Sequence, residues 1–284
     1  MKYISINCDE ELIEFRKKLY RDKIDIIAVD FEAEYKLHTN EEKLCLIQIF
    51  DNTNYYIIDP FNISKNEIQK TFEDKRTIKL FYGASSDKSL LLEQYNIQIK
   101  SLLDLKVLVD TIGFEHKGLD SILNEVLGIT VVGKKRYQKH NWTLRPIDSK
   151  AIEYALSDVR YLFILKSELI KRINDTKKVE KLIINMVKNE NTKNKQIKPK
   201  IFRTKEYKEL SNIEQCRFEK IFLLRESVAE DTNTPPNNVI LNEKLFELSK
   251  NSEAINNLAF SKRLDSNVRQ SIINKIKILW EETI

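Results

Sequence analysis

The sequence predicts a mixed α/β fold followed by a smaller all-α domain. Two observations predict the first part: apolar runs of strand length alternate with stretches of helical periodicity, and a hairpin-type connection adds antiparallel pairing to crossover connections. The second part is predicted because strand signals vanish from about Glu206 onward. The chain has 284 residues, of which 42% are apolar, which is enough for one or two domains with their own cores.

The elements of the first part follow from apolar spacing and from the residues that flank each run. The uninterrupted apolar run from Ile24 to Val29 is typical of a strand covered on both faces. In order, the expected elements are helix 9–20 with Asp9 as candidate cap, strands 24–29, 44–50 and 55–58, helix 64–72, strand 78–82, and helices 86–95, 102–112, 118–127 and 149–172.

A basic segment from Lys188 to Lys208 separates the two parts. It holds eight Lys or Arg against two Glu, so the rest of the chain carries about −1 of the total charge of +5. Pro199 and the lack of apolar periodicity predict a domain boundary near residue 200. The segment is either a solvated linker or a phosphate-contacting arm. Beyond it, helices are expected at 213–231, 242–249, 252–258 and 266–281.

The composition disfavours several classes of protein. No apolar run approaches the ~20 residues that span a bilayer. The N-terminus has no apolar signal region, so we expect a cytoplasmic protein. Cys8, Cys45 and Cys216 have no metal-type spacing and are expected to be reduced thiols. The three histidines are scattered as well, which disfavours a zinc site.

Two acids follow the apolar run of the first long strand. Asp30 and Glu32 are two residues apart, so their side chains leave a strand on the same face, whereas Phe31 points the other way, into the core. Acids at the end of a buried strand do not serve packing. We therefore interpret them as part of a catalytic constellation that a rigid element holds in place.

Three further residues are suited to complete this site. Asp87 follows Gly83-Ala-Ser-Ser at the start of a predicted helix, where α/β folds place ligands. Tyr154 and Asp158 are four residues apart on another predicted helix and share a face. Carboxylate oxygens are the ligands that Mg²⁺ and Mn²⁺ prefer. Singly, each pattern is typical of a surface acid or a helix cap, but together they indicate a divalent-metal site.

These motifs, in this order, resemble those of the DEDD exonucleases, in the subgroup whose third motif contains tyrosine. The matching segments are Val29-Asp-Phe-Glu32, Gly83-Ala-Ser-Ser-Asp87 and Tyr154-Ala-Leu-Ser-Asp158. Flanking segments narrow the resemblance to the RNase D family over roughly residues 1–175: Leu44-Cys-Leu-Ile-Gln48, Ile58-Asp-Pro60 and Arg145-Pro146. The subgroup with a catalytic His needs that residue just before position 154, where this chain has Glu153.

The resemblance implies an RNase H-like mixed sheet with flanking helices, and a 3′→5′ exonuclease that uses two divalent ions, Mg²⁺ or Mn²⁺. It assigns Asp30, Glu32 and Asp158 to the metal that activates water, with Asp30 bridging to a second metal that Asp87 supports. Tyr154 is expected to position the attacking water or to help deprotonate it. The implied substrate is RNA with a free 3′ end, a tRNA precursor or another small structured RNA, degraded stepwise to nucleoside 5′-monophosphates. A monomer is favoured.

Residues just before the third motif are candidates for nucleic-acid binding. They are Lys135, Arg136, Gln138, Trp142 and Arg145. With Lys134, the first two form a basic cluster suited to phosphate. Trp142 either stacks on substrate or, the favoured alternative, fills the core. Arg145 contacts phosphate or forms a structural ion pair.

The helical tail resembles the helicase-and-RNase-D C-terminal (HRDC) domain through Leu223-Leu-Arg-Glu-Ser-Val-Ala229 and Asn233-Thr-Pro-Pro236. We therefore expect an exonuclease domain at 1–190, a basic linker at 191–206 and an HRDC-like domain at 207–284. The tail either binds nucleic acid or only stabilises and spaces the exonuclease domain. Two other functions stay open: a DNA-directed 3′→5′ exonuclease of repair or proofreading type, and a catalytically silent RNA-binding scaffold.

Overall fold

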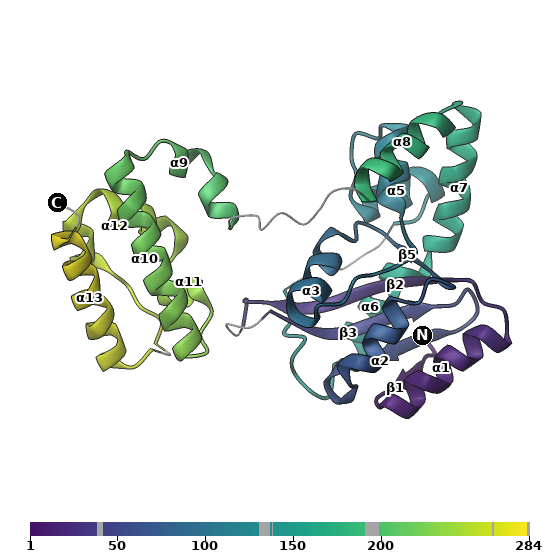
Figure 1. Ribbon diagram of the computed structural model, residues 1–284, viewed down its shortest axis with the longest axis horizontal. Coiled ribbons are helices and arrows are strands. Elements are labelled where there is room, and N and C mark those ends of the chain that lie inside the picture. Colours follow the sequence, from purple (N-terminus) through teal and green to yellow (C-terminus); the bar gives the residue numbers. More distant parts are fainter. Residues whose placement is uncertain (39–41, 131–136, 138, 191–198, 263, 283–284) are drawn as a thin grey trace. The chain divides into compact units, whose positions relative to one another are not determined.

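The structure is a computed structural model that describes residues 1–282 except 39–41, 131–136, 138, 191–198 and 263. It divides into two compact units (Figure 1). The first unit comprises Met1–Glu34 and Glu42–Lys193, and the second comprises Tyr35–Glu41 and Asn194–Ile284. Each unit is described by itself below.

The first unit contains a six-stranded mixed sheet with the strand order β1-β4-β3-β2-β5-β6. The strands are β1 (Ile4–Ile6), β2 (Ile26–Tyr35), β3 (Glu42–Phe50), β4 (Tyr55–Ile58), β5 (Ile78–Phe81) and β6 (Leu102–Asp104). β3 and β4 form the expected antiparallel hairpin, while β1 runs parallel to β4, and β5 parallel to both β2 and β6. The predicted mixed sheet is therefore confirmed.

β2 continues past the point where the sequence placed its end, so Asp30 and Glu32 lie inside the strand. The expectation that they terminate it was wrong. Phe31 and Ala33 are buried and alternate with the two acids, so the period-two pattern of a strand persists after the all-apolar run stops. Phe31 points into the core as predicted and packs edge-on against the rings of Phe72 and Phe81.

Helices cover both faces of this sheet (Figure 1). On one face, the core joins Ile27, Val29 and Phe31 of β2 to side chains of the helices α1 (Asp9–Arg21), α2 (Lys65–Phe72) and α3 (Ser85–Tyr95). On the other face, Ala28 of β2 packs with Val159 and with residues of α4 (Leu105–Ile112) and α5 (Leu119–Leu127). The face that carries Ala28 also carries Asp30 and Glu32, because side chains two apart on a strand point the same way.

The long helix expected at 149–172 is two helices. α6 (Ser149–Arg160) packs on β3 and α7 (Leu162–Asp175) packs on α4 and α5, with the break at Tyr161 (φ −104°, ψ 2°). A third helix, α8 (Val179–Glu190), follows and packs on α4. Because the two halves cover different partners, one straight helix does not satisfy both. Asp158 therefore stands near the C-terminal end of α6.

Three smaller expectations also differ from the structure. The strands β1 and β6 were not predicted, because three residues are too few to show a period. The segment expected to be helical from 102 is β6 up to Asp104, whose side chain then caps α4 by accepting the N–H of Lys106. The residue preceding α1 is Cys8 rather than Asp9, and the Asp9 carboxylate instead accepts the backbone N–H of Ser64 at 2.7 Å.

The C-terminal segment of the second unit, from Pro199 onward, is helical in its described part. Its elements are the 3₁₀ turns η3 (Lys200–Arg203) and η4 (Ser252–Asn257) and the helices α9 (Lys205–Lys208), α10 (Asn212–Asp231), α11 (Pro236–Val239), α12 (Asn242–Lys250) and α13 (Ser266–Glu281). α10 begins with a reciprocal capping box between Ser211 and Glu214. Phe218 and Ile221 of α10 pack with Leu245 of α12 and Ile276 of α13 in one apolar core.

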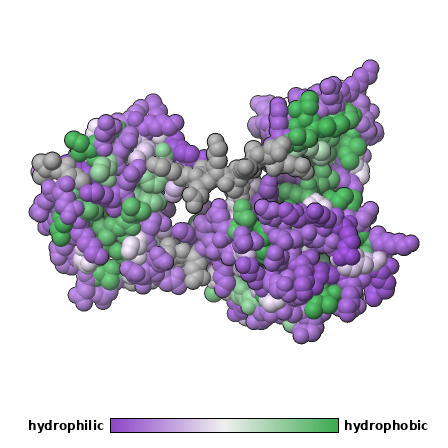
Figure 2. All heavy atoms as spheres, in the orientation of Figure 1, coloured by the Kyte–Doolittle hydropathy of each residue, from purple (hydrophilic) through white to green (hydrophobic). Residues whose placement is uncertain are grey.

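The face shown in Figure 2 is mostly hydrophilic, and apolar side chains gather on it around α8. On this helix Val179, Ile183 and Val187 are exposed. Within the described ranges, no helix has the combined length and apolarity that crossing a bilayer requires.

Candidate active site

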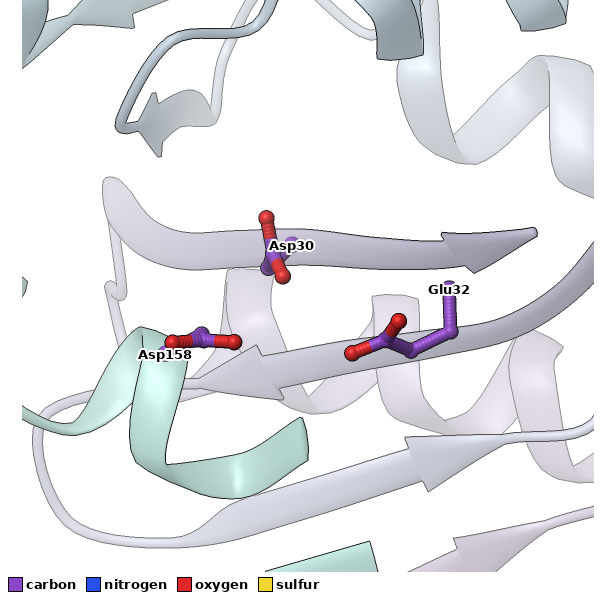
Figure 3. Close-up of side chains that lie close together, drawn as sticks. All are labelled: Asp30, Glu32 and Asp158. Carbon is purple, nitrogen blue, oxygen red and sulfur yellow. The ribbon is translucent and has the colours of Figure 1, made fainter. Parts of the chain in front are cut away.

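Three of the predicted acids converge on one place. Asp30 and Glu32 project from β2, and Asp158 projects from α6, which covers this face of the sheet (Figure 3). Each residue offers one carboxylate oxygen, and these three oxygens lie within 4.8 Å of one another. The side chains come from positions 128 residues apart in the sequence, so only the packing of α6 on the sheet brings them together.

The donor set fits a hard divalent cation. All three contributions are carboxylate oxygens, the ligand type that Mg²⁺ and Mn²⁺ favour. Two oxygens on opposite sides of Mg²⁺ lie about 4.2 Å apart, since each Mg–O bond is about 2.1 Å. Oxygens on adjacent sides lie about 3.0 Å apart, so the three carboxylates, within 4.8 Å of one another, are close enough to close on one ion by a modest side-chain adjustment. No His or Cys joins the group in the described part of the chain, so a site of zinc type is not formed there.

Tyr154 adjoins the three acids. Burial, followed by the negative charges of Asp158, Glu32 and Asp30, raises the pKa of its phenol well above the ordinary value. The phenol therefore keeps its proton at neutral pH, and its O–H is a hydrogen-bond donor. An O–H donor is suited to positioning a water or a substrate oxygen, and the choice between positioning and proton abstraction stays a prediction.

Asp87 lies in the first turn of α3 and is 7% exposed, but the structure does not place its carboxylate in the three-oxygen group. Burial and the charge of Asp104 raise the pKa of Asp87 to about 6, against a partly compensating hydrogen bond to its own backbone. Asp104 also holds the turn before α3, because its carboxylate accepts the N–H groups of Gly83 and Ala84 at 2.7 and 3.1 Å. A metal-binding role for Asp87 stays a prediction.

The five candidates for nucleic-acid binding fare differently. Lys135, Arg136 and Gln138 lie outside the described residues. Trp142 is 2% exposed, so its ring is packed in the core rather than open to a base. Arg145 forms an ion pair with Asp59, the alternative that the sequence had left open. The geometry disfavours direct contact of nucleic acid with Trp142 and Arg145.

Sequence reasoning named Trp142 but did not link it, or Tyr137 and His140, to Tyr154. The ring of Tyr137 stacks on that of Tyr154 with centroids 5.5 Å apart, and the ring of Trp142 does so at 6.2 Å. His140 packs edge-on against Trp142 at 4.9 Å. These residues lie within 17 positions of Tyr154, yet no spacing rule links aromatic residues of an irregular segment to a helix. Their density in the segment 137–142 was the one available signal.

A cluster of acids on the central part of a mixed sheet, closed over by a helix that adds one acid and a phenol, defines a class of protein: a domain that holds divalent cations against an anionic substrate. Residues 3–174 match the family model described as 3′-5′ exonuclease. Because this match spans more than half of the 284 residues, the chain belongs to the 3′-5′ exonuclease family, and its RNase D-like, DEDD-type character is confirmed.

Individual relatives agree. The chain is 27% identical over 172 residues to ribonuclease D of Escherichia coli, which covers 60% of this chain and 44% of the relative. It is 25% identical over 175 residues to the rat exosome complex component 10, covering 58% of this chain and 19% of the relative. The chain thus spans about a fifth of the length of that component. The crystal structure of E. coli RNase D shares the fold, with a TM-score of 0.71 at 20% identity over 100% of this chain and 75% of that chain.

Proposed function

We propose that this protein is a two-metal-ion 3′→5′ exoribonuclease that releases nucleoside 5′-monophosphates one at a time. The observation that carries the proposal is the group of three carboxylate oxygens within 4.8 Å, with the phenol of Tyr154 beside it. Hydrolysis of a phosphodiester is slow because its anionic oxygens repel a nucleophile. A site that concentrates divalent cations removes this obstacle.

The residues divide the work as follows. Asp30, Glu32 and Asp158 would hold one ion, Asp30 would also contribute to a second, and Asp87 would support the second. The ions, Mg²⁺ or Mn²⁺, would supply neutralising charge to the phosphate and to the attacking and leaving oxygens. Tyr154 donates its O–H to orient the attacking water. Water forms the new P–O bond, the bond from phosphorus to the 3′ oxygen breaks, and the shortened strand keeps that oxygen as a 3′ hydroxyl with a proton from the water.

RNA is the proposed substrate, in 3′-end processing of tRNA precursors or other small structured RNA. The support is the likeness to E. coli RNase D, an exoribonuclease involved in structured RNA processing. A DNA-directed 3′→5′ exonuclease is the alternative, because the same carboxylates act on either phosphate backbone and only contacts to the 2′-OH distinguish the two. A silent RNA-binding scaffold is disfavoured by the intact acid group.

The proposal also covers the domain organisation, the oligomeric state and the cellular location of the protein. The second unit is proposed to be an HRDC-like domain at 207–284, joined through a basic linker at 191–206 to the exonuclease domain at 1–190. A compact helical core of its own supports this division. We also propose a monomer in the cytoplasm. The free thiols of Cys8, Cys45 and Cys216 agree with a reducing compartment.

The direct test uses matched single-stranded RNA and DNA oligonucleotides labelled at the 5′ end, with Mg²⁺, with Mn²⁺ and with EDTA. We expect RNA to shorten one nucleotide at a time, release of 5′-monophosphates, and no reaction in EDTA. Asp30→Ala should abolish release while the circular dichroism spectrum is kept. Preferential shortening of DNA favours the alternative, and binding of RNA without any metal-dependent shortening contradicts an enzymatic function.

A further inference from the structure

Arg145 has no N–H group left for a substrate. Its Nε donates to Asp59 at 2.5 Å, and one Nη donates to Asp59 at 3.0 Å and to the backbone oxygen of Cys45 at 2.8 Å. The other Nη donates to the backbone oxygens of Trp142 and Leu144 at 2.8 and 2.9 Å. A guanidinium has five N–H donors, and all five are used. A phosphate contact by Arg145 requires breaking one of these bonds.

These bonds tie three separate elements together. Asp59 follows the C-terminal end of β4, Cys45 belongs to β3, and Trp142 and Leu144 precede α6. The guanidinium also lies over the ring of Phe61, 4.2 Å from its centroid, and Asp59 accepts the N–H of that same residue. Burial alone raises the pKa of Asp59, but the hydrogen bond and charge of Arg145, together with the N–H of Phe61 and the charge of Lys43, lower the pKa below its ordinary value, so the carboxylate stays ionised.

The segment that Arg145 fixes carries an aromatic wall against Tyr154. We use this name for the rings of Tyr137, His140 and Trp142. The planes of Trp142 and Tyr154 are inclined by only 28°, and those of Tyr137 and Tyr154 by 26°. Arg145 holds the backbone oxygen of Trp142 itself, so one guanidinium links the residue whose ring stacks on Tyr154 to Asp59 and to β3.

We propose that Arg145 and Asp59 form a positioning pair that sets the orientation of Tyr154 through the aromatic wall. Arg145 does not bind the substrate. The inference rests on the proposed function of Tyr154 in orienting the attacking water. Displacing an orienting group by about 1 Å costs up to roughly a hundredfold in rate, so a rigid support for the phenol has a measurable purpose.

The test compares Arg145→Lys with the unaltered full chain on a single-stranded RNA. Lysine keeps the positive charge but lacks the planar fork that bonds Asp59, Cys45 and Trp142 together. We expect kcat to fall roughly tenfold to a hundredfold, while KM and the salt dependence of KM stay unchanged. Arg76→Lys is the matched control, because Arg76 also pairs with an aspartate, Asp74, and lies over a ring, that of Tyr20. Its kcat should stay unchanged.

A second measurement separates positioning from a general structural role. In the background Tyr154→Phe, Arg145→Lys should lower kcat by less than twofold, since the group that it positions is already gone. The proposal is overturned if, in that background, Arg145→Lys lowers kcat by the same factor as it does in the unaltered chain. A rise in KM with a shallower salt dependence and unchanged kcat also overturns it, because that result marks a phosphate contact.

A replacement variant and a check of the proposed function complete the test. Should Arg145→Lys fail to fold, Trp142→Phe takes its place: the backbone bond to Arg145 remains, and the weaker stacking on Tyr154 is expected to lower kcat without changing KM. An unchanged kcat for a folded Trp142→Phe contradicts the proposal. Absence of metal-dependent nucleotide release by the unaltered chain overturns the proposed function and this inference with it. A change confined to KM overturns the inference alone.

Discussion

The carboxylate of Asp104 accepts the backbone N–H of Gly83 at 2.7 Å and so joins the end of β6 to the turn between β5 and α3. The same carboxylate accepts the N–H groups of Ala84 and Lys106. Gly83 adopts φ +78°, a conformation that residues with a side chain disfavour. The residue that precedes α3 provides no side-chain cap for this helix. One residue thus supports both the turn that leads to Asp87 and the start of α4.

Asp104→Ala is therefore expected to destabilise the first unit by about 2 kcal/mol or more, because three backbone N–H groups lose their acceptor. Urea unfolding monitored by circular dichroism measures this. Ser64→Ala is the matched control: it removes a single cap bond, to Glu67 in α2, and should cost about 1 kcal/mol. Equal losses for the two variants contradict a joint role for Asp104.

Gln48→Leu is expected to stabilise the protein. The side chain of Gln48 is 0% exposed, and both of its polar atoms are buried without a hydrogen-bond partner among the residues that the structure describes. A buried amide left in this condition costs about 1–3 kcal/mol, and leucine of similar volume removes that cost.

The measurement is the free energy of unfolding of the Gln48→Leu variant, from the urea midpoint. The opposite sign is expected for Gln215→Leu, since the amide of Gln215 donates to the backbone oxygens of Tyr207 and Leu210. A loss of stability in Gln48→Leu shows that this amide is bonded in solution, for instance to a buried water.

The stability of the first unit should rise with pH above neutrality because of Lys79. This side chain is 0% exposed and donates to the backbone oxygens of Asp74 and Lys100. Burial lowers the pKa of Lys79 from 10.5 to about 8, against the charge of Asp74. Between these two values the unfolded chain binds more protons than the folded chain, so stability increases as pH rises through this window.

The variant Lys79→Met isolates the contribution of Lys79 to the pH dependence of stability. The difference in free energy of unfolding between Lys79→Met and the unaltered chain should shift in favour of the unaltered chain from pH 7.5 to pH 9.5, a range chosen to lie on both sides of the folded-state pKa of about 8. A difference that stays constant over this range contradicts the lowered pKa.

Divalent cations should raise the melting temperature. Asp30, Glu32 and Asp158 repel one another when no cation is bound, and an ion that binds only the folded state stabilises it by about 2.7 kcal/mol at a hundredfold excess over Kd. Thermal denaturation with and without Mn²⁺ measures the shift. Asp30→Ala should abolish it, whereas Asp110→Ala, which removes a surface acid paired with Lys117, should retain it. Equal shifts in both variants place the ion elsewhere.

Much of the fold was predictable because its signals are local. The β3–β4 hairpin, α2 and α3 follow from apolar runs and their flanking turn residues, and the structure confirms them within one or two positions. The short edge strands β1 and β6 were not predictable. Each adopts strand structure by pairing with a neighbouring strand, and its own sequence shows no alternating pattern. The break at Tyr161 has the same origin: different packing partners on its two sides override a continuous helical pattern.

The site shows the same division. Asp30, Glu32 and Asp158 were recognisable because their chemistry and order repeat a known pattern, and the structure unites them. For Arg145 the sequence left phosphate contact and an ion pair open, since the partner Asp59 lies 86 residues away and only the tertiary fold makes them neighbours. The structure decides for the ion pair, and a count of the five N–H donors shows that all are used within the protein.

The position of Asp30 and Glu32 inside β2 has a consequence for how these two side chains bind a cation. β5 pairs with β2 over Ile26–Ala28, and β2 runs on beyond this stretch to carry both acids, with β3 beside it in the sheet. Because strand geometry fixes the backbone under the two acids more tightly than a loop does, a cation arriving there would meet two carboxylates at a nearly set spacing. Less conformational entropy would then be lost on binding than at a site built on a loop.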